Sequence, residues 1–328
     1  MNTVAICIPT RNQSPFLAQA VRSALAQTHP CEVWVSDDAS TDNTPEIMAE
    51  LAKQFPQLHS HRQEQNLGIE GNPTWVMQQP QTEFIVRLDS DDVLEPEYVA
   101  ILLAGMAAHP KAGFAHAAVR EINGQGQEQK LRRLARDSGF QDAEESLRAS
   151  VTGYRVAANI CLFRKAALDA VGYYQKLSFA EDWDMAVRLA DAGWGNVYVS
   201  EVLANYRVWE TVDKIRSRRK LAEIEGCRRM FEESLIPAFT RRNWSLASIT
   251  SARRRLALHH GVSLGVGGLT DEQKEELQSA LCRLGDSVAL RLKFLWISTP
   301  LAPVFQFPTM LMATVKAWCK ATLYKGHA

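Results

Sequence analysis

The chain has 328 residues, of which 46% are hydrophobic and 23% are charged. This length and composition are typical of a globular protein that buries a full core, as one large domain or two smaller ones. Lysine plus arginine and aspartate plus glutamate both number 37, so the protein lacks the net positive field that favours binding to nucleic acid.

The charge is distributed unevenly along the chain. Residues 1–210 contain 18 basic and 27 acidic residues, whereas residues 211–328 contain 19 and 10. The six cysteines are scattered without a CxxC pair, which favours free thiols in a reducing cytosol over zinc binding or disulfides. Residues 1–9 have no basic leader and are too short for a signal-peptide core. We therefore expect a cytoplasmic protein.

The first third of the chain alternates short apolar runs with helical patterns. This alternation predicts an α/β protein with a mostly parallel central sheet that is covered by helices on both faces. In the helix expected over 44–55, Thr44 is the predicted cap and Pro45 the first helical residue. The expected strands are 4–8, 31–36 and 84–88, and the expected helices are 15–27 and 44–55.

The middle of the chain continues the α/β pattern to about residue 210. A strand is expected at 112–119, and the polar stretch 120–150 begins with a predicted loop at 123–130. Further strands are expected at 155–163, 195–200 and 202–208, with helices at 165–172 and 182–193. Beyond this part, helical patterns cover roughly 212–236, 241–264 and 270–290.

Three carboxylates follow the strand "FIVRL" (84–88). Asp89, Asp91 and Asp92 lie where a parallel sheet gathers its ligands, beyond the carboxyl end of a strand, and they exceed what one helix cap requires. An EF-hand calcium loop is excluded because its glycine and glutamate positions are Leu94 and Ala100. Oxygen ligands on one short turn favour Mg²⁺ or Mn²⁺ that is shared with phosphate oxygens.

Two other strand ends carry polar groups. "WVSDDAST" (34–41) places Asp38 directly after a strand, where its carboxylate can accept a hydrogen bond from a nucleotide base. "PTRN" (9–12) adds Thr10 and Arg11 at the end of the first strand. Because the carboxyl ends of parallel strands share one edge of a sheet, the three loops predict a common nucleotide site.

Six segments follow one another along the chain: "AICIPTRNQ", "VSDDASTDNT", "NLGIEGN", "LDSDDVLEP", "NICLFRKAALDAVGYY" and "AEDWDMAVRLADAG". Together and in this order they resemble the inverting glycosyltransferases of family 2, which have the GT-A fold. The resemblance covers about residues 3–207. It implies a Rossmann-like α/β/α sandwich that forms a catalytic domain over 1–210. The helical C-terminal region over 211–328 lies beyond the resemblance and is predicted from the sequence pattern alone. Within the catalytic domain, 1–110 is implied to bind the nucleotide sugar and 111–210 the acceptor.

The resemblance also implies a role for each matching residue. Asp182 is the expected general base, although its position also suits a simple helix cap. Asp91 and Asp92 are the expected ligands of Mn²⁺ or Mg²⁺, and Asp38 and Asp89 the expected contacts of the base and of the ribose or donor sugar. The residues implied on the nucleotide-sugar side are Pro9, Thr10, Arg11, Asp38, Asp89, Glu181 and Arg207.

One position departs from the family pattern. Many relatives carry a histidine after the last strand that helps to hold the metal or the diphosphate, whereas "NYRVWE" (205–210) has Trp209 there. Arg207 in the same segment can still bind phosphate.

The expected reaction is inverting transfer of a sugar from a nucleoside-diphosphate sugar, expected to be UDP-linked, to a hydroxyl of a glycan or lipid-linked saccharide in the synthesis of a bacterial surface polysaccharide. Two alternatives are a sugar nucleotidyltransferase and a non-catalytic nucleotide-sugar-binding module. The first would show a glycine-rich phosphate loop after its first strand, and residues 9–16 contain no glycine.

The C-terminal region suggests contact with a membrane. Residues 294–315 carry no charge, include three prolines and follow a basic region. These features predict either peripheral contact with anionic lipid on the cytoplasmic face of the inner membrane or packing of the apolar side chains on the catalytic domain.

Overall fold

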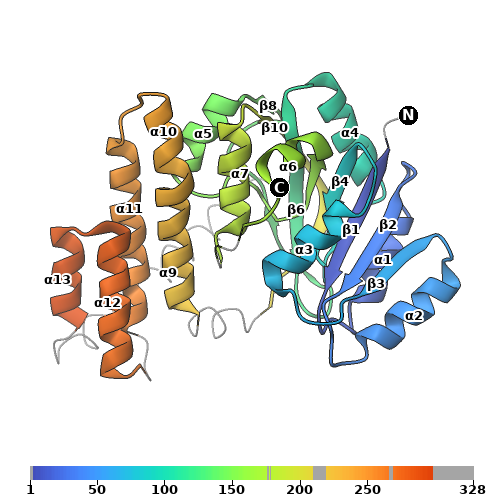
Figure 1. Cartoon of the computed structure of the whole chain (residues 1–328), viewed down its shortest axis with the longest axis horizontal. Coiled ribbons are helices and arrows are strands. Elements are labelled where there is room, and N and C mark those ends of the chain that lie inside the picture. The colour runs from blue at the N-terminus through green and yellow to red at the C-terminus, as the bar shows by residue number, and fades with distance from the viewer. Residues whose placement is uncertain (1–2, 176, 178, 210–218, 266–268, 298–328) are drawn as a thin grey trace, which may run out of the picture. The chain divides into compact units, whose positions relative to one another are not determined.

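A computed structural model describes residues 3–175, 177, 179–209, 219–265 and 269–297 (Figure 1). The chain divides into two compact units, Met1–Ile249 and Thr250–Ala328. The boundary expected at residue 210 falls next to residues 210–218, which lie outside the described part, and the first unit includes the helical residues that follow them.

The first unit is built around one mixed β-sheet with the strand order β3-β2-β1-β4-β9-β6-β10-β5. The pairs β1–β2, β1–β4, β2–β3 and β6–β10 are parallel, and β9 runs antiparallel to both β4 and β6. Six strands of the sheet therefore run in one direction, as expected of a mostly parallel sheet. They are β1 (Val4–Thr10), β2 (Glu32–Asp37), β3 (Leu58–Arg62), β4 (Phe84–Arg87), β6 (Ala112–Ile122) and β10 (Gly195–Arg207).

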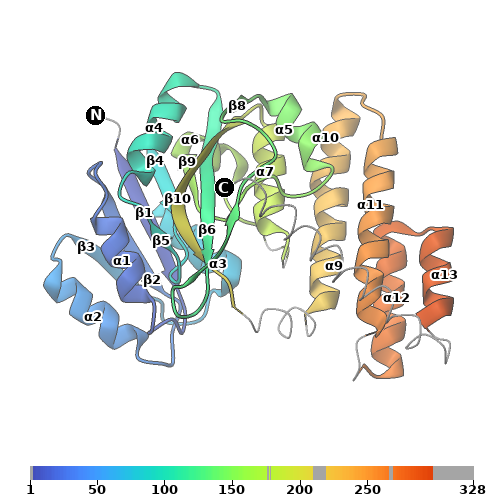
Figure 2. The same ribbon diagram turned by 180° about the vertical axis from the view of Figure 1, so that it is seen from behind.

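Helices cover both faces of this sheet (Figures 1 and 2). Successive side chains of a strand point to opposite faces, so the apolar run of β1 serves two cores. Val4, Ile6 and Ile8 pack in one hydrophobic cluster with residues of α1, α2 and α4, whereas Ala5 and Cys7 pack in another with residues of α3, α6 and α7. The helices are α1 (Leu17–Leu25), α2 (Thr44–Gln54), α3 (Gly68–Gln78), α4 (Tyr98–Ala108), α6 (Lys165–Val171) and α7 (Glu181–Asp191).

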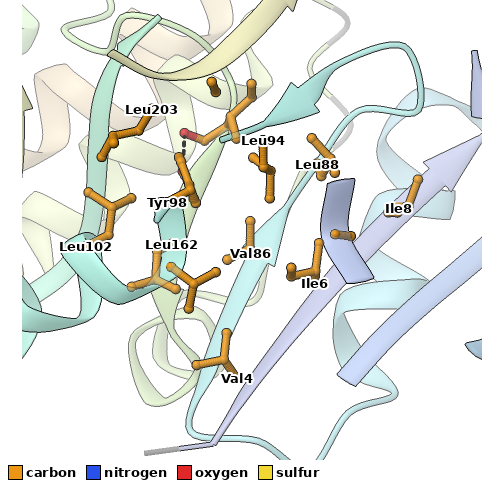
Figure 3. Close-up of a cluster of buried hydrophobic side chains, with 14 of the residues drawn as sticks. Val4, Ile6, Ile8, Val86, Leu88, Leu94, Tyr98, Leu102, Leu162 and Leu203 are labelled. Atoms are coloured by element: carbon orange, nitrogen blue, oxygen red, sulfur yellow. Dashed lines mark hydrogen bonds between the residues drawn. The ribbon is translucent and has the colours of Figure 1, made fainter. Parts of the chain in front are cut away.

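Figure 3 shows the core on the α4 side of the sheet, where side chains from β1 and β4 meet Leu102 and Tyr98. Tyr98 is fully buried, and its hydroxyl donates to the carbonyl oxygen of Ile160 at 3.0 Å. A buried hydroxyl without a partner is costly, so this bond fixes α4 against the segment that precedes β9 (Cys161–Arg164).

The remaining strands differ from the sequence expectation. Residues 123–130, predicted to be a loop, turn the chain into an antiparallel hairpin between β6 and β7 (Glu128–Arg132). The two strands expected at 195–200 and 202–208 are one strand, β10, with register shifts between Val199 and Ala204. The strands β5 (Val93–Leu94) and β8 (Gly139–Gln141) both pair antiparallel with β10.

One local prediction was wrong, and one helix was missed. Thr44 is not the cap of α2 but its first residue, because the helix is preceded by Asn43 and Thr44 Oγ1 accepts a hydrogen bond from the Gln13 amide. The helix α3, which contains Pro73, was not expected from the sequence.

The chain of the first unit continues through helical residues after β10. They comprise α9 (Lys220–Arg229), a π-helical stretch (Met230–Leu235) and α10 (Ile236–Arg241). Another helix, α5 (Ala143–Ser150), precedes β9 in the chain and packs against α7. Ser234 donates a hydrogen bond to Asp184 of α7, which joins the π-helical stretch to the α/β part of the same unit.

The second unit is helical in its described part. The helix α11 (Ala247–His260) spans the boundary between the units and is followed by a short 3₁₀ turn (Gly261–Gly265), α12 (Asp271–Gly285) and α13 (Val288–Ile297). Thr270 and Gln273 form a capping box at the start of α12. No helix among the residues described here is long and apolar enough to cross a membrane. Residues 298–315 of the uncharged segment lie outside the described part.

Candidate active site

Three parallel strands bring the predicted loops to one edge of the sheet. Thr10 at the end of β1 is in register with Asp37 at the end of β2, and Cys7 of β1 is in register with Arg87 at the end of β4. The loops that begin at Arg11, Asp38 and Leu88 therefore leave the sheet side by side. This edge is where ligands bind in open α/β sheets.

The loops after β1 and β2 are joined by hydrogen bonds. Asn12 has a positive φ of 51°, its amide donates to Ser40 Oγ at 2.8 Å, and its side-chain oxygen accepts from the Thr41 amide at 2.8 Å. The Ser14 amide donates to Asp42 at 3.1 Å. The motifs "PTRN" and "DDASTDNT" thus form one structured wall of the site, and the hydroxyl of Thr10 is buried there without a partner among the described residues.

Asp38 holds a third loop in place. Its carboxylate accepts from the amides of Leu67 at 2.6 Å and Gly68 at 3.1 Å, and Arg11 lies 3.8 Å away. The side chain is only 5% exposed, so its first role is to fix "NLGIEGN" at the edge of the sheet. Gly68 has a φ of 88°, a conformation that favours glycine at this contact.

The acidic turn after β4 separates its three carboxylates into different environments. Asp92 is almost fully buried and accepts from the Arg207 amide at 2.7 Å, and its other oxygen has no partner among the described residues. Asp91 is partly exposed, and burial together with the charge of Asp89 raises its pKa. Burial and the charges of Asp91 and Asp89 raise the pKa of Asp92 well above its usual range. The protein contacts of this turn therefore do not fully compensate the charge that three ionised carboxylates would carry.

The end of β10 closes the site beside this turn. Trp209 donates from Nε1 to Asp91 Oδ2 at 2.9 Å, and its ring packs edge-on against Phe16, with the ring centroids 5.0 Å apart. The guanidinium of Arg207 donates to the carbonyl oxygen of Asp91 at 2.8 Å, to that of Asn123 at 2.7 Å and to Gln19 at 3.1 Å. Arg207 lies where the sequence predicts it, but these contacts anchor it to the protein.

Asp182 lies in the first turn of α7 and contacts the same edge of the sheet. Its Oδ1 accepts from Arg87 Nη1 at 2.7 Å, and Arg87 also contacts Asp89 at 3.0 Å. Burial raises the pKa of Asp182, and the charge of Arg87 opposes that shift. Asp182 is therefore a partly shielded carboxylate next to the predicted donor site, which suits a general base.

The two acids beside Asp182 differ in their contacts. Asp184 is buried and accepts from Arg188 Nε at 2.5 Å, which makes it part of the packing of α7. Glu181 is 8% exposed, its Oε2 has no partner among the described residues, and burial followed by the charge of Asp182 raises its pKa to about 6. An unpartnered carboxyl beside the candidate base suits contact with a substrate hydroxyl.

Replacement of Glu181 by glutamine is expected to stabilise the fold at neutral pH. A carboxyl whose pKa is raised on folding is harder to ionise in the native state, so the wild type loses stability as the pH rises from about 4.5 to about 6. The loss amounts to about 2 kcal/mol, because one pKa unit corresponds to roughly 1.4 kcal/mol. Thermal unfolding of both proteins between pH 4 and 8 should show the difference growing in that window and then staying constant.

The structure brings the predicted site residues to one edge of the sheet, through the ends of β1, β2, β4 and β10 and the start of α7. Sequence reasoning missed Arg87, which contacts both Asp89 and Asp182, and Tyr174, whose ring lies under the Arg87 guanidinium at 4.9 Å. An arginine within an apolar strand pattern directly before an acidic turn was the available signal for Arg87.

Solved structures share this fold. The chain matches the structure of TarS from S. aureus with a TM-score of 0.64 at 20% identity, over 86% of this chain and 80% of that one. It matches a mannosyltransferase from Pyrobaculum calidifontis, solved with GDP-Man and Mn²⁺, with a TM-score of 0.59 at 18% identity, over 99% of this chain and 88% of that one. At these identities the likeness shows the fold alone.

Curated relatives show similarity at the sequence level. The chain is 29% identical to the chondroitin synthase of Escherichia coli over 192 residues, which are 58% of this chain and 27% of that enzyme. It is 29% identical over 205 residues to a beta-monoglucosyldiacylglycerol synthase of Synechocystis, again 58% of this chain and 41% of the relative. The chain thus spans less than half the length of these relatives.

A family comparison agrees with the strand-end motifs and with the fold. The sequence model of glycosyl transferase family 2 matches residues 5–172, which is more than half of the chain. That match includes the loops after β1 and β2 and the acidic turn after β4. The chain therefore belongs to glycosyl transferase family 2.

Proposed function

We propose that the protein transfers a sugar from a nucleoside-diphosphate sugar to a hydroxyl of a glycan or lipid-linked saccharide, with inversion at the anomeric carbon. The observation that carries this proposal is the position of Asp182, which is joined through the single side chain of Arg87 to Asp89 at the donor edge. A base beside the donor-binding acids is what attack by an acceptor hydroxyl requires.

In the proposed reaction the acceptor oxygen attacks the anomeric carbon from the face opposite the nucleotide. A new carbon–oxygen bond forms while the bond from the anomeric carbon to the β-phosphate oxygen breaks, and its electron pair leaves with the nucleoside diphosphate. Asp182 receives the proton of the acceptor hydroxyl. Glu181 accepts a hydrogen bond from the acceptor, and Asp89 binds ribose or donor-sugar hydroxyls.

The wall formed by the first two strand-end loops is the proposed nucleotide site. Pro9, Thr10 and Arg11 line it, and the hydroxyl of Thr10 is buried there without a partner among the described residues. Asp38 supports this wall through Leu67 and Gly68, so we propose that it contributes to base recognition mainly by holding that loop.

The acidic turn fits a divalent cation, Mn²⁺ or Mg²⁺, that is shared with the diphosphate. No cluster of three or more histidine, cysteine or acidic side chains with metal-binding geometry occurs in the described part of the chain. This agrees with an ion that takes one or two carboxylates and completes its shell with phosphate and water. Asp91 would hold the ion, and Asp92, which is buried against Arg207, would hold the turn. When bound, the ion stabilises the charge of the leaving diphosphate.

Product analysis tests the proposed reaction. The full chain is incubated with Mn²⁺ and UDP-GlcNAc, UDP-glucose or GDP-mannose, with water or an added oligosaccharide as acceptor. Release of free UDP or GDP supports sugar transfer. A parallel reaction supplies a nucleoside triphosphate and a sugar 1-phosphate instead, and release of pyrophosphate there supports a nucleotidyltransferase. Release of neither product in the two reactions contradicts both functions. UDP-linked donors are our first choice, because TarS, which shares the fold, was solved with UDP-GlcNAc.

Trp209 gives a prediction about the metal. Its indole N–H donates to Asp91 and cannot bind a cation, whereas the imidazole nitrogen of histidine can. Trp209→His is therefore expected to bind Mn²⁺ about tenfold more tightly than Trp209→Phe, in line with the usual effect of one group around a metal site. Electron paramagnetic resonance of free Mn²⁺, titrated in the presence of UDP, measures this. Equal affinities of the two variants would exclude a metal-binding role for this position.

The helix α13 has an exposed apolar face, which supports our proposal of peripheral contact with a membrane. Val288, Leu292, Leu295 and Trp296 are between 52% and 76% exposed, and their spacing places them on one face of the helix. Residues 211–328 also carry an excess of basic residues, which complements anionic lipid. We propose that the protein acts at the cytoplasmic face of the inner membrane, on a lipid-linked acceptor.

Sedimentation with vesicles that contain phosphatidylglycerol tests this contact. The wild type is expected to bind at low salt, and the double variant Leu292→Glu, Leu295→Glu is expected to lose most of that binding, because two charges oppose burial of the apolar face. Ile69→Glu with Leu131→Glu, which places the same charges on exposed apolar residues of the first unit, serves as the control. Equal binding by the two double variants would exclude α13 as the contact.

A further inference from the structure

Arg87 is a buried cation that contacts two carboxylates from distant parts of the chain. It ends β4, and its side chain is 7% exposed. Nε and Nη2 lie 3.1 and 3.0 Å from Asp89 Oδ1, and Nη1 lies 2.7 Å from Asp182 Oδ1. Because side chains alternate along β4, Arg87 points to the sheet face covered by α7, the helix that carries Asp182.

These contacts differ from those of two other arginines of the same unit. Arg207 and Arg188 donate mainly or partly to backbone carbonyl oxygens and so tie segments of the chain together. Apart from a hydrogen bond with the Tyr174 side chain, Arg87 donates in the described part of the chain to the carboxylates of Asp89 and Asp182, which are both proposed site residues. Burial lowers the pKa of Arg87, but the charges of Asp89 and Asp182 more than offset this effect, so the guanidinium stays charged.

The surroundings of Asp182 give Arg87 a specific task. Asp182 borders a small cavity of about 10 Å³ that is lined mainly by apolar side chains, with Tyr154, Cys161 and Tyr174 as polar members. The neighbours of Asp182 include one cation, the guanidinium of Arg87. The others are acidic or neutral side chains, namely Asp89, Glu181, Tyr154, Cys161 and Tyr174. A carboxylate in such a setting is protonated unless a positive charge compensates it.

We propose that Arg87 is a positioning residue for sugar transfer: by binding Asp182 and Asp89 together, it keeps the base ionised and fixes it beside the donor-binding carboxylate. This inference rests on the function proposed above. Its consequence is that the pH at which the base becomes active depends on a residue that contacts neither the acceptor nor the nucleotide.

The test compares Arg87→Met with the wild type in the release of UDP from UDP-GlcNAc, or of GDP from GDP-mannose, across pH 5 to 9 with Mn²⁺. Without the cation the ionised form of Asp182 is less favoured, so the acid limb of the kcat profile should move to higher pH by about one to three units. At pH 7 kcat should fall at least tenfold, and raising the pH should restore part of it.

A matched control is Arg164→Met. Arg164 is a partly buried arginine on the neighbouring strand β9, but it contacts Glu83 and backbone carbonyl oxygens away from the site. This variant should keep the acid limb of the wild type. An unshifted acid limb in Arg87→Met, with kcat lowered equally at every pH, would overturn the proposal, because that result indicates a structural role.

Arg87→Lys keeps the test decisive if the methionine variant does not fold. Lysine retains the charge but cannot contact both carboxylates through a planar fork, so kcat should fall at least tenfold while the acid limb stays close to that of the wild type. Wild-type kcat in Arg87→Lys would overturn the positioning role. Failure of the wild type itself to release any nucleoside diphosphate would instead contradict the proposed function.

Discussion

Asp182→Asn is expected to lower kcat by about 10² to 10⁴-fold, the usual range for loss of general-base catalysis. Asparagine has the same shape, and its carbonyl oxygen can still accept the hydrogen bond that Arg87 Nη1 donates at 2.7 Å. The variant should therefore fold and bind UDP with Mn²⁺ as the wild type does. Steady-state release of nucleoside diphosphate and a calorimetric titration with UDP measure the two quantities separately.

Asp191→Asn provides the matched control for this variant. Asp191 lies at the end of the same helix, where it pairs with Arg241 and Arg242 far along the sequence from the candidate base. Its replacement should leave kcat unchanged. If Asp182→Asn retained kcat, or lost UDP affinity as severely as activity, Asp182 could not be the base.

Asp91→Asn is expected to abolish the effect of Mn²⁺ on nucleotide binding. The pKa of Asp91 is raised by burial and by Asp89, so its negative charge is poorly compensated by the protein alone and is available to a cation. In the wild type Mn²⁺ should strengthen UDP binding and raise the melting temperature, since a ligand that binds the native state stabilises it. The variant should show the same melting temperature with UDP whether or not Mn²⁺ is present.

Glu97→Gln is the control for the acidic turn, because Glu97 is an exposed acid that directly precedes α4 without a side-chain hydrogen bond to the helix. It should keep the full response to Mn²⁺. A response to Mn²⁺ in Asp91→Asn equal to that of the wild type would exclude Asp91 as the metal ligand.

The fold could be predicted from the sequence where strands and helices alternate regularly. The apolar runs of β1 and β4 are nearly continuous because both of their faces are buried, which is the pattern of a parallel sheet. The edge strand β3 has only Leu58 buried, so its sequence "LHSHR" shows no strand pattern and was missed. Likewise the polar sequence of 123–130 indicates a loop, although its second half pairs with β6.

The sequence predicts the site as a set of acidic residues at strand ends, but it does not predict which contacts each of these residues makes. Neighbouring aspartates look alike in sequence, and only their contacts distinguish Asp92, which holds the Arg207 amide, from Asp91, which faces Trp209. The pairing of Arg87 with Asp182 joins residues 95 positions apart, so no local pattern could indicate it. Such long-range contacts depend on the packing of α7 against the sheet.

The departure at Trp209 is informative because the structure gives the tryptophan a defined contact. It neither binds a metal nor leaves an empty space, since its N–H donates to Asp91 and its ring packs on Phe16. At the position where relatives are expected to have a metal ligand, this chain therefore has Trp209, which donates a hydrogen bond to Asp91 of the acidic turn.

The most direct test of a nucleotide–metal site at this sheet edge is a crystal structure of the full chain with UDP and Mn²⁺, in which anomalous scattering locates the manganese. We predict one peak between the Asp91 carboxylate and the diphosphate, with the nucleotide against the loops that follow β1 and β2. Manganese bound away from Asp91, or a nucleotide bound outside these loops, would contradict the account.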